Sequence, residues 1–317
     1  MKTFSFLSLL LLSAAMIYVS GCNSDTESFI KEGSIEAEGG EIRYRIVGAD
    51  KPATPLLVVH GGPGANHQYL ITLESLAIDR PVIFYDQLGC GNSDPLNDTS
   101  LMTPDRYARE LKQLMETLGY DGYFLLGQSW GGALAAHYLL EFDQGLAKAA
   151  VFSAPLLSTP LWEADQQVWL AQLPQQDQDA IREADSTGDY SAQPYLDAMD
   201  AYYARHLCRI DPWPDFLLES FGNLNAAIYN HMWGYSEFTV CGTLKNFDLT
   251  PRLPEIEIPV LFTCGEFDEA RPETCGYFAG LIPDAELFVM EGCSHVHHVE
   301  DQTVYNARIS EFLNHVH

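Results

Sequence analysis

Three side chains of this sequence could together cleave an acyl bond if the fold brings them to one place. Ser129 stands between two glycines in Gly127-Gln-Ser-Trp-Gly131, and Asp268 and His295 follow it along the chain. A serine hydroxyl becomes a nucleophile when a base takes its proton, and that base needs a third group to hold its orientation. These residue types therefore predict nucleophilic catalysis through an acyl-enzyme.

The segment around Ser129 has the pattern of a strand, a tight turn and a helix. The apolar run 123–126 precedes the turn, and the small-residue, helix-favouring run 133–140 follows it. In a G-x-S-x-G turn of this kind the serine hydroxyl is exposed at the end of a sheet, and the flanking glycines avoid the crowding that a Cβ atom would cause. We therefore expect Ser129 at the carboxyl end of a strand.

The acid is expected in the loop after a later apolar run, 259–264. This loop contains three carboxylates, Glu266, Asp268 and Glu269. We choose Asp268, the shorter carboxylate midway along the loop, and Glu266 and Glu269 stay open as alternatives. An acid in this loop gives the chain order of nucleophile, acid and histidine that one large class of serine hydrolases uses.

The base is expected just after the next apolar run. His295 is the first histidine beyond that run, and His297 and His298 follow closely enough to be alternatives. His315 and His317 belong to the C-terminal tail. We choose His295 because it lies nearest to the end of the expected strand.

A tetrahedral intermediate also needs hydrogen-bond donors for its oxyanion. One donor is the backbone N–H of the residue after the nucleophile, here Trp130. The other is expected from the glycine-rich loop His60-Gly-Gly-Pro-Gly64, which ends the apolar run 55–60. Glycines let the backbone approach a substrate closely, so we expect Gly61 to donate, with Gly62 as the second choice.

Apolar runs alternate with helical patterns in two parts of the chain. A hairpin-like segment, 34–47, opens the first part, 34–155, and the second part covers 248–317. Between them, residues 156–247 have few strand-like runs and many aromatic residues in helical stretches. The pattern predicts an α/β fold with a mostly parallel sheet, helices on both faces and an inserted helical cap over the strand ends.

The first 22 residues have the pattern of an export signal. Lys2 precedes the apolar stretch 4–19, and the segment ends in Val19-Ser-Gly-Cys22. This ending resembles a bacterial lipobox, so we expect Cys22 to carry a lipid and residues 23–33 to form a tether. The protein is then exported and anchored to the bacterial cell envelope, on its periplasmic or outer surface. An ordinary signal peptide and a retained membrane anchor are the alternatives.

The composition excludes several classes of partner. The chain has 17 basic and 44 acidic side chains, and its formal net charge of −27 would repel nucleic acid. The cysteines beyond Cys22 form no C-x-x-C pair, so no metal site is expected. A serine nucleophile requires no cofactor. Free thiols and disulfides are both compatible with the cysteine spacing.

Five motifs together are typical of one peptidase family. They are His60-Gly-Gly-Pro-Gly64, Asp86-Gln-Leu-Gly-Cys-Gly-Asn-Ser93, Gly127-Gln-Ser-Trp-Gly-Gly132, Gly265-Glu-Phe-Asp-Glu269 and Cys293-Ser-His295. With them the chain resembles the proline iminopeptidase (prolyl aminopeptidase) family of α/β-hydrolase serine peptidases. One departure is Leu88, where the family's loop usually carries arginine, so a local ion pair is in doubt but the triad is not.

The resemblance implies an activity and a way of binding the substrate. The enzyme is expected to release N-terminal proline, or a similar apolar residue, from short peptides or aminoacyl amides. Glu237 and Glu269 match the carboxylates that hold the free amine, since a buried ammonium needs fixed negative partners. Two alternatives stay open: hydrolysis of amino-acid amides or esters by the same triad, and a non-catalytic surface lipoprotein.

Overall fold

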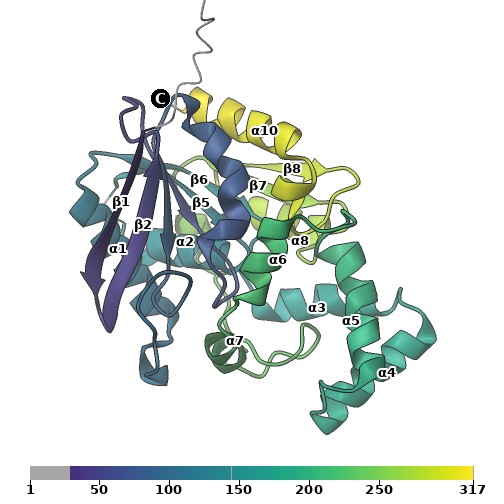
Figure 1. The fold of residues 1–317 in the computed structure, drawn as a ribbon. Coiled ribbons are helices and arrows are strands. Elements are labelled where there is room, and N and C mark those ends of the chain that lie inside the picture. Colours follow the sequence, from purple (N-terminus) through teal and green to yellow (C-terminus); the bar gives the residue numbers. More distant parts are fainter. Residues whose placement is uncertain (1–28, 144, 317) are drawn as a thin grey trace, which may run out of the picture.

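The computed structural model describes residues 29–143 and 145–316, and this part of the chain contains one mixed sheet. Its strands are β1 (Ile30–Ala37), β2 (Gly40–Val47), β3 (Leu56–Val59), β4 (Val82–Asp86), β5 (Tyr123–Gln128), β6 (Ala147–Ser153), β7 (Val260–Gly265) and β8 (Ala285–Met290). They follow one another in the order β1-β2-β4-β3-β5-β6-β7-β8. Strand β2 pairs antiparallel with β1 and β4, and the other neighbours pair in parallel. All strands except β2 therefore run in one direction, and their carboxyl ends meet at one edge of the sheet (Figure 1).

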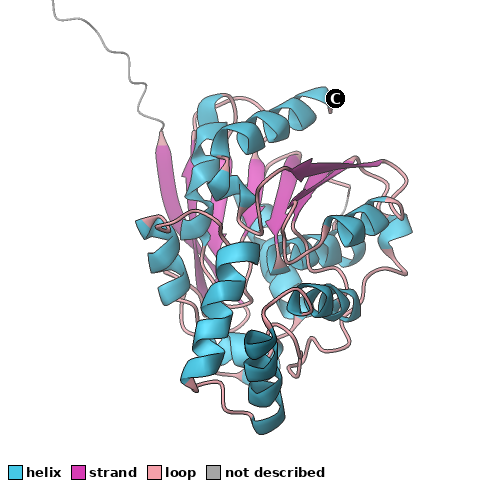
Figure 2. Ribbon diagram, turned by 90° about the vertical axis from the view of Figure 1, so that its right-hand side faces the viewer, coloured by secondary structure: helices cyan, strands magenta, loops and turns pink. Residues whose placement is uncertain are grey.

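Helices cover both faces of this sheet (Figure 2). They are α1 (Pro104–Leu118), α2 (Trp130–Glu141), α3 (Thr159–Leu170), α4 (Gln175–Thr187), α5 (Gln193–His206), α6 (Asp215–Gly222), α7 (Ala226–Met232), α8 (Pro272–Ala279), α9 (His297–Glu300) and α10 (Gln302–His315), with the 3-10 segments η1 (His67–Ile78), η2 (Thr99–Leu101) and η3 (Leu253–Glu255). Helices α1, α2 and α8 pack on one face, and η1 and α10 pack on the other. The predicted α/β fold is confirmed.

The central strands are buried on both faces because most of their side chains are apolar. In β3, Leu57 and Val59 belong to one core cluster, whereas Leu56 and Val58 belong to the other. Successive side chains of a strand point to opposite faces, so a continuous apolar run fills both layers of the core. Because the strands are buried, the positions of their carboxyl ends are fixed. The loops that carry Ser129, Asp268 and His295 begin at those ends.

Helix α1 shows how the local sequence sets the ends of an element. The Thr103 side chain accepts the N–H of Arg106, and Pro104 begins the helix. At the other end Gly119 has φ 70° and donates its N–H to the Met115 carbonyl. These capping interactions set the first and the last turn of the helix.

Helices α3 to α7 form the cap, inserted between β6 and β7 and drawn below the sheet in Figure 1. Helices α3 to α5 share a core of their own: Trp169, Leu170, Leu173, Ile181, Ala184, Tyr195, Ala198, Met199, Tyr202 and Phe238. Helices α6 and α7 instead pack on the two sheet cores, through Leu217 and Ile228. The N–H of Asn225, just before α7, donates to the Gly64 carbonyl at 2.8 Å. The cap therefore lies directly on the glycine-rich loop.

The N-terminal boundary of the fold differs from the prediction. Strand β1 begins at Ile30, inside the segment predicted as a tether, because residues 30–33 pair with residues 44–47 of β2. The export signal and Cys22 lie outside the described residues. In the described ranges, no helix has both the length and the apolar character needed to cross a bilayer.

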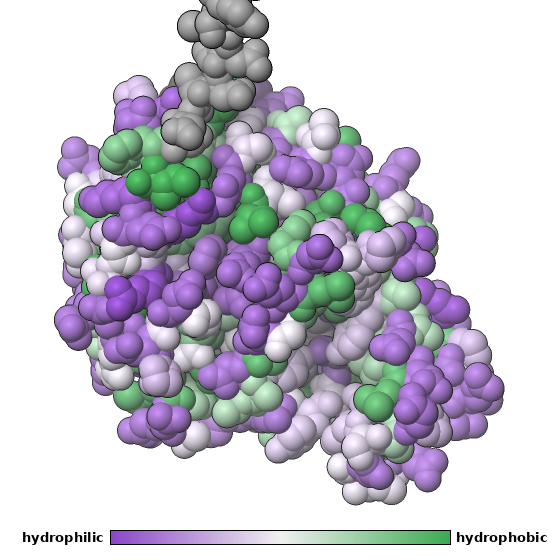
Figure 3. Space-filling view, in the orientation of Figure 1, coloured by the Kyte–Doolittle hydropathy of each residue, from purple (hydrophilic) through white to green (hydrophobic). Residues whose placement is uncertain are grey.

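The surface and the thiols agree with the composition. The face drawn in Figure 3 is mostly hydrophilic. The cysteines at 90, 208, 241, 264, 275 and 293 are free thiols, and Cys241 is the exposed one. Among residues 29–143 and 145–316, no group of three or more His, Cys, Asp or Glu side chains is arranged to hold a metal ion.

Candidate active site

Ser129 lies on the tight turn between β5 and α2. Its backbone has φ 56° and ψ −123°, a conformation that costs free energy for any residue with a Cβ atom. The Ser129 N–H donates to the Ser153 carbonyl at 2.9 Å, and the Leu156 N–H donates to the Ser129 carbonyl at 3.1 Å. The fold thus holds this serine in a strained conformation, as sites of nucleophilic catalysis do.

Two glycines make this turn possible. A Cβ atom at Gly127 would collide with the backbone of Gly131, and a Cβ atom at Gly131 would collide with the Val59 carbonyl group. The turn therefore packs against the end of β3 so closely that no larger residue fits.

Asp268 and His295 meet beside the turn. His295 Nδ1 lies 2.7 Å from Asp268 Oδ1. The Asp268 carboxylate also accepts the N–H of Gly265 at 3.0 Å and that of Ala270 at 2.9 Å, so its own loop fixes its position. Ser129 and His295 line one pocket, and no hydrogen bond joins their side chains in the described structure. Such serine–histidine bonds are often long until a substrate binds.

Charge around His295 favours its protonated form. Burial alone lowers the pKa of His295, but the Asp268 carboxylate, followed by Glu269 and Glu237, raises it to about 9. The imidazole also packs edge-on against Trp162, with 5.7 Å between the ring centroids. His295 is thus a buried, oriented base that is coupled to three carboxylates.

The two nearest alternative bases have structural partners. His297 Nε2 lies 2.9 Å from Thr263 Oγ1, and burial lowers the pKa of His297 to about 4. His298 Nε2 lies 3.2 Å from the Tyr69 carbonyl oxygen, and burial lowers the pKa of His298 to about 3. Both side chains are buried away from the pocket, so neither faces a substrate.

The remaining alternatives also lie elsewhere. Glu266 is exposed and accepts the N–H of Gly292 at 2.9 Å. His315 is exposed in the last turn of α10, and its Nδ1 lies 2.7 Å from the Glu311 carbonyl oxygen. His317 lies outside the described residues. Of the carboxylates in the acid loop, Asp268 is the one that reaches Nδ1 of His295.

In the glycine-rich loop, Gly61 does not have the free N–H group that was expected of an oxyanion donor. The Gly61 N–H donates to the Tyr69 hydroxyl at 2.7 Å, so the amide expected to hold an oxyanion already has an acceptor. Gly62 has φ 114° and lines the pocket with Ser129. The geometry therefore favours Gly62, the second choice, over Gly61 as the donor from this loop.

The other expected donor, the N–H of Trp130, is at the first position of α2. N–H groups in the first turn of a helix have no partner within it, so this amide is available beside the nucleophile. The Trp130 side chain is fully buried, and its Nε1 donates to Gln87 Oε1 at 3.1 Å. Gln87 Nε2 in turn donates to the His60 carbonyl at 2.8 Å. These bonds fix the start of α2 relative to the glycine-rich loop.

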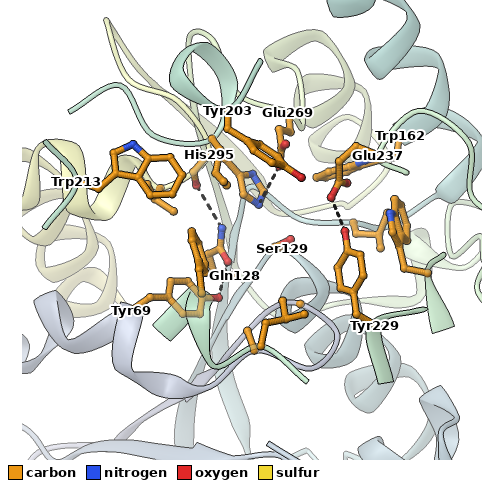
Figure 4. Close-up of a pocket in the computed structure, with 18 residues that line it drawn as sticks. Tyr69, Gln128, Ser129, Trp162, Tyr203, Trp213, Tyr229, Glu237, Glu269 and His295 are labelled. Atoms are coloured by element: carbon orange, nitrogen blue, oxygen red, sulfur yellow. Dashed lines mark hydrogen bonds and ion pairs between the residues drawn. The ribbon is translucent and has the colours of Figure 1, made fainter. Parts of the chain in front are cut away.

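A cavity of about 330 Å³ opens above Ser129 (Figure 4). Its apolar and aromatic lining is formed by Ala65, Tyr69, Leu156, Trp162, Tyr203, Leu207, Trp213, Phe221, Leu224, Tyr229, Trp233 and Val296. In Figure 4 Trp213 lies to one side of Ser129, and Glu237 with Tyr229 lies to the other. The indole of Trp213 and the carboxylate of Glu237 therefore lie on opposite sides of the nucleophile, and Trp162 lies on the same side as Glu237.

Glu237 and Glu269 bring two carboxylates into this cavity. Glu269 Oε2 lies 3.8 Å from His295 Nε2, and Glu269 Oε1 has no hydrogen-bond partner within the described part of the chain. The Tyr229 hydroxyl donates to Glu237 Oε1. Burial raises the pKa of both carboxyls, that of Glu269 to about 8. Buried carboxylates with free acceptor positions are suited to bind an ammonium group.

The pocket residues that were not found from the sequence include Tyr69, Gln128 and Tyr229. The Tyr69 hydroxyl donates to Gln128 Oε1 at 2.6 Å, and Gln128 Nε2 donates to the His295 carbonyl at 3.2 Å. Gln128 occupies the unconstrained position of the G-x-S-x-G pattern, and a tyrosine in an apolar stretch is indistinguishable from a core residue. No spacing in the sequence singles them out.

A buried ion pair made by other residues lies beside Leu88. Arg106 and Glu110 of α1 pair at 2.5 Å and are both buried. The Leu88 N–H donates to the Glu110 carboxylate at 3.2 Å. Burial raises the pKa of Glu110 to about 7, although Arg106 acts to lower it. Here the guanidinium comes from the helix that faces the loop.

A strained serine after β5, an acid after β7 and a histidine after β8 are the arrangement of α/β hydrolases. The family model described as the alpha/beta hydrolase fold matches residues 54–302. A proline iminopeptidase of Heyndrickxia coagulans is 43% identical over 284 residues, which are 89% of this chain and 98% of that relative. The chain therefore belongs to the proline iminopeptidase family.

Solved structures support the same assignment. The crystal structure of VinJ superimposes with a TM-score of 0.85 at 32% identity and covers 90% of this chain and 99% of its own. The crystal structure of a proline iminopeptidase from Mycobacterium smegmatis has a TM-score of 0.82 at 33% identity, with 90% and 98% of the two chains covered. Both span the core and the cap.

Proposed function

We propose that this chain is a serine aminopeptidase that releases N-terminal proline, or a similar apolar residue, from short peptides. The observation that carries the proposal is a pair of carboxylates, the buried Glu269 and the half-buried Glu237, in the same small cavity as Ser129. A substrate with a free amine and an apolar first side chain matches the carboxylates and the aromatic lining of this cavity. The relatives named proline iminopeptidase support the same substrate class.

The reaction follows from the positions of the side chains. Ser129 Oγ attacks the carbonyl carbon of the first residue while His295 Nε2 takes the hydroxyl proton, and Asp268 holds the imidazole through Nδ1. The N–H groups of Trp130 and Gly62 stabilise the oxyanion. His295 then protonates the departing amine. In the second half of the reaction His295 takes a proton from water, the water oxygen attacks the acyl carbon, and His295 returns the proton to Ser129 Oγ as the ester bond breaks. Glu237 and Glu269 hold the ammonium group, so only the first peptide bond reaches Ser129.

The test is hydrolysis of L-proline p-nitroanilide by the wild-type protein and by Ser129→Ala. The substitution removes only the nucleophilic oxygen, so the variant should unfold at the same denaturant concentration and show no turnover above background. A fluorophosphonate probe should label the wild-type protein and not the variant. Undiminished hydrolysis by Ser129→Ala refutes the assignment.

A substrate panel defines the specificity. Prolyl, alanyl and leucyl p-nitroanilides compare the first residue, and N-acetyl-prolyl p-nitroanilide tests the amine. The N-acetylated substrate should not be hydrolysed, because its neutral amide would leave both carboxylates in the cavity without a counter-ion. Equal rates with and without the acetyl group would instead indicate a general amidase or esterase.

We further propose that the protein is exported and tethered to the bacterial cell envelope through lipidated Cys22. The proposal is supported by the sequence pattern alone, the charged residue, apolar stretch and Val19-Ser-Gly-Cys22 ending. Cells that express the protein should incorporate labelled palmitate into it, and it should partition with membranes. Cys22→Ala should abolish both, and unchanged membrane partitioning of this variant would refute lipid anchoring.

A further inference from the structure

We propose that Glu269 acts as a substrate-operated switch on the base: in the free enzyme it holds the Nε2 side of His295, and the substrate's ammonium draws it away. Nε2 is then free to take the proton of Ser129. The inference rests on the proposed aminopeptidase function. It adds that the free amine is needed for the chemical step and not only for binding.

The geometry places the imidazole between two carboxylates from adjacent residues of one loop. Asp268 Oδ1 lies 2.7 Å from Nδ1. Glu269 Oε2 lies 3.8 Å from Nε2, and Figure 4 shows Glu269 next to His295. Nε2 is the atom that must receive the Ser129 proton. In the free protein the nearest charged partner of that atom is thus a carboxylate, which attracts a protonated ring and competes with the serine.

Glu269 is also positioned to form an ion pair with another cation in place of His295. Its side chain is buried, yet its Oε1 has no hydrogen-bond partner in the described residues. The cavity has Glu237 as a second carboxylate, which accepts a bond from Tyr229. A buried carboxylate with a free acceptor position gains most from a cation that can donate to it, and the N-terminal ammonium is such a cation.

The charge balance of the cluster supports this exchange. Burial opposes charge on His295, but Asp268, Glu269 and Glu237 together raise its pKa to about 9. A positive charge placed between Glu237 and Glu269 offsets two of these three influences and lowers the pKa again. The other titratable groups around the cluster include Tyr195, Tyr202, Tyr203, His206, Tyr229 and His297.

The test compares two substrates that differ only in charge, prolyl p-nitroanilide and cyclopentanecarbonyl p-nitroanilide. The second has CH₂ where the first has NH₂⁺, so it keeps the shape and loses the amine. The neighbouring carboxylates hold the pKa of His295 above its usual range, so the base of the free enzyme is largely protonated at pH 7. At pH 7 the kcat of the neutral substrate should therefore be about 10- to 100-fold below that of the prolyl substrate, and it should rise as the pH approaches 9.

Glu269→Gln provides the second measurement. It removes the charge that holds Nε2, so the kcat ratio of the two substrates at pH 7 should fall at least about fivefold, and the KM of the prolyl substrate should rise. Glu266→Gln, in the same loop but exposed and outside the cavity, should leave the ratio unchanged.

The outcomes separate the switch from the proposed function. Failure of the wild-type protein to cleave prolyl p-nitroanilide overturns the aminopeptidase function. Efficient cleavage with equal kcat for both substrates, with the difference confined to KM, overturns the switch alone. The same holds if Glu269→Gln leaves the kcat ratio as it is in the wild type.

Discussion

The Tyr69 hydroxyl donates a hydrogen bond of 2.6 Å to Gln128 Oε1 and accepts the Gly61 N–H at 2.7 Å. Gln128 Nε2 continues the chain of bonds to the His295 carbonyl at 3.2 Å. The glycine-rich loop, the turn that holds the nucleophile and the loop that holds the base are therefore joined through one buried phenol. The relative positions of the reacting groups depend on this phenol, although it takes no proton in the reaction.

Tyr69→Phe should slow catalysis more than it weakens binding. Loss of the hydroxyl leaves the Gly61 N–H and the Gln128 side chain without a partner, at a cost of about 1–3 kcal/mol. We expect kcat for prolyl p-nitroanilide to fall about 10- to 100-fold with a smaller change in KM. Tyr85→Phe is the matched control, because the Tyr85 hydroxyl is buried and has no partner among the described residues. Equal kcat values for the two variants would contradict the positioning role.

Gly131→Ala should disrupt the nucleophile turn. The new Cβ atom would collide with the carbonyl group of Val59, which the sheet holds in place. We expect a loss of about 2–4 kcal/mol in the free energy of unfolding, measured in urea, together with loss of activity. At Gly222, at the end of α6, a Cβ atom meets nothing within 4 Å, so Gly222→Ala should match the wild type. An unchanged urea midpoint for Gly131→Ala would show that the turn can move.

His298 should make the protein sensitive to acid. Burial lowers the pKa of His298 from 6.5 to about 3, so below pH 6.5 the unfolded chain binds a proton that the folded protein does not. The free energy of unfolding therefore decreases as the pH falls through this window, by about 1.4 kcal/mol per pH unit for this group. His298→Asn should reduce the slope between roughly pH 6 and pH 4 by that amount. His315 is exposed, so His315→Asn should leave this slope unchanged. Equal slopes in the two variants would show that His298 is not the group responsible for the acid sensitivity.

Trp213 should limit the size of the first residue. It lines the cavity and packs edge-on against Phe221, with 6.1 Å between the ring centroids. Trp213→Ala should raise kcat/KM for leucyl relative to prolyl p-nitroanilide by about tenfold, since the enlarged cavity favours the longer side chain. Tyr235→Ala changes an exposed cap aromatic outside the cavity and should leave the ratio as it is. A ratio unaffected by Trp213→Ala would place the specificity elsewhere.

The sequence was sufficient for the sheet and for the order of the reacting groups. Runs such as 55–60 and 259–264 are largely apolar, as is typical of strands buried on both faces. Since parallel strands end at one edge, the residues just beyond them, Ser129, Asp268 and His295, had to lie near one another. The predicted tether was too long because β1 begins with polar and charged residues on an exposed edge of the sheet.

The contacts between side chains in the active site could not be predicted in the same way. The distance between Glu269 and His295 depends on side-chain packing of a loop, which has no periodic signal. The engagement of the Gly61 amide depends on Tyr69, which comes from η1 and looks like any buried aromatic residue. Long-range pairing of this kind is a property of the packed interior and is absent from local sequence patterns.

Strand β1 runs in the same direction as the strands that carry the reacting groups, so Ile30 lies at the end of the molecule opposite to the cap (Figure 1). Any support attached ahead of Ile30, such as a bead, a resin or a bilayer, would hold the enzyme on the side opposite to the cap. The mouth of the cavity would then face the surrounding solution. A preparation immobilised through its amino end should therefore digest peptides as freely as the dissolved enzyme.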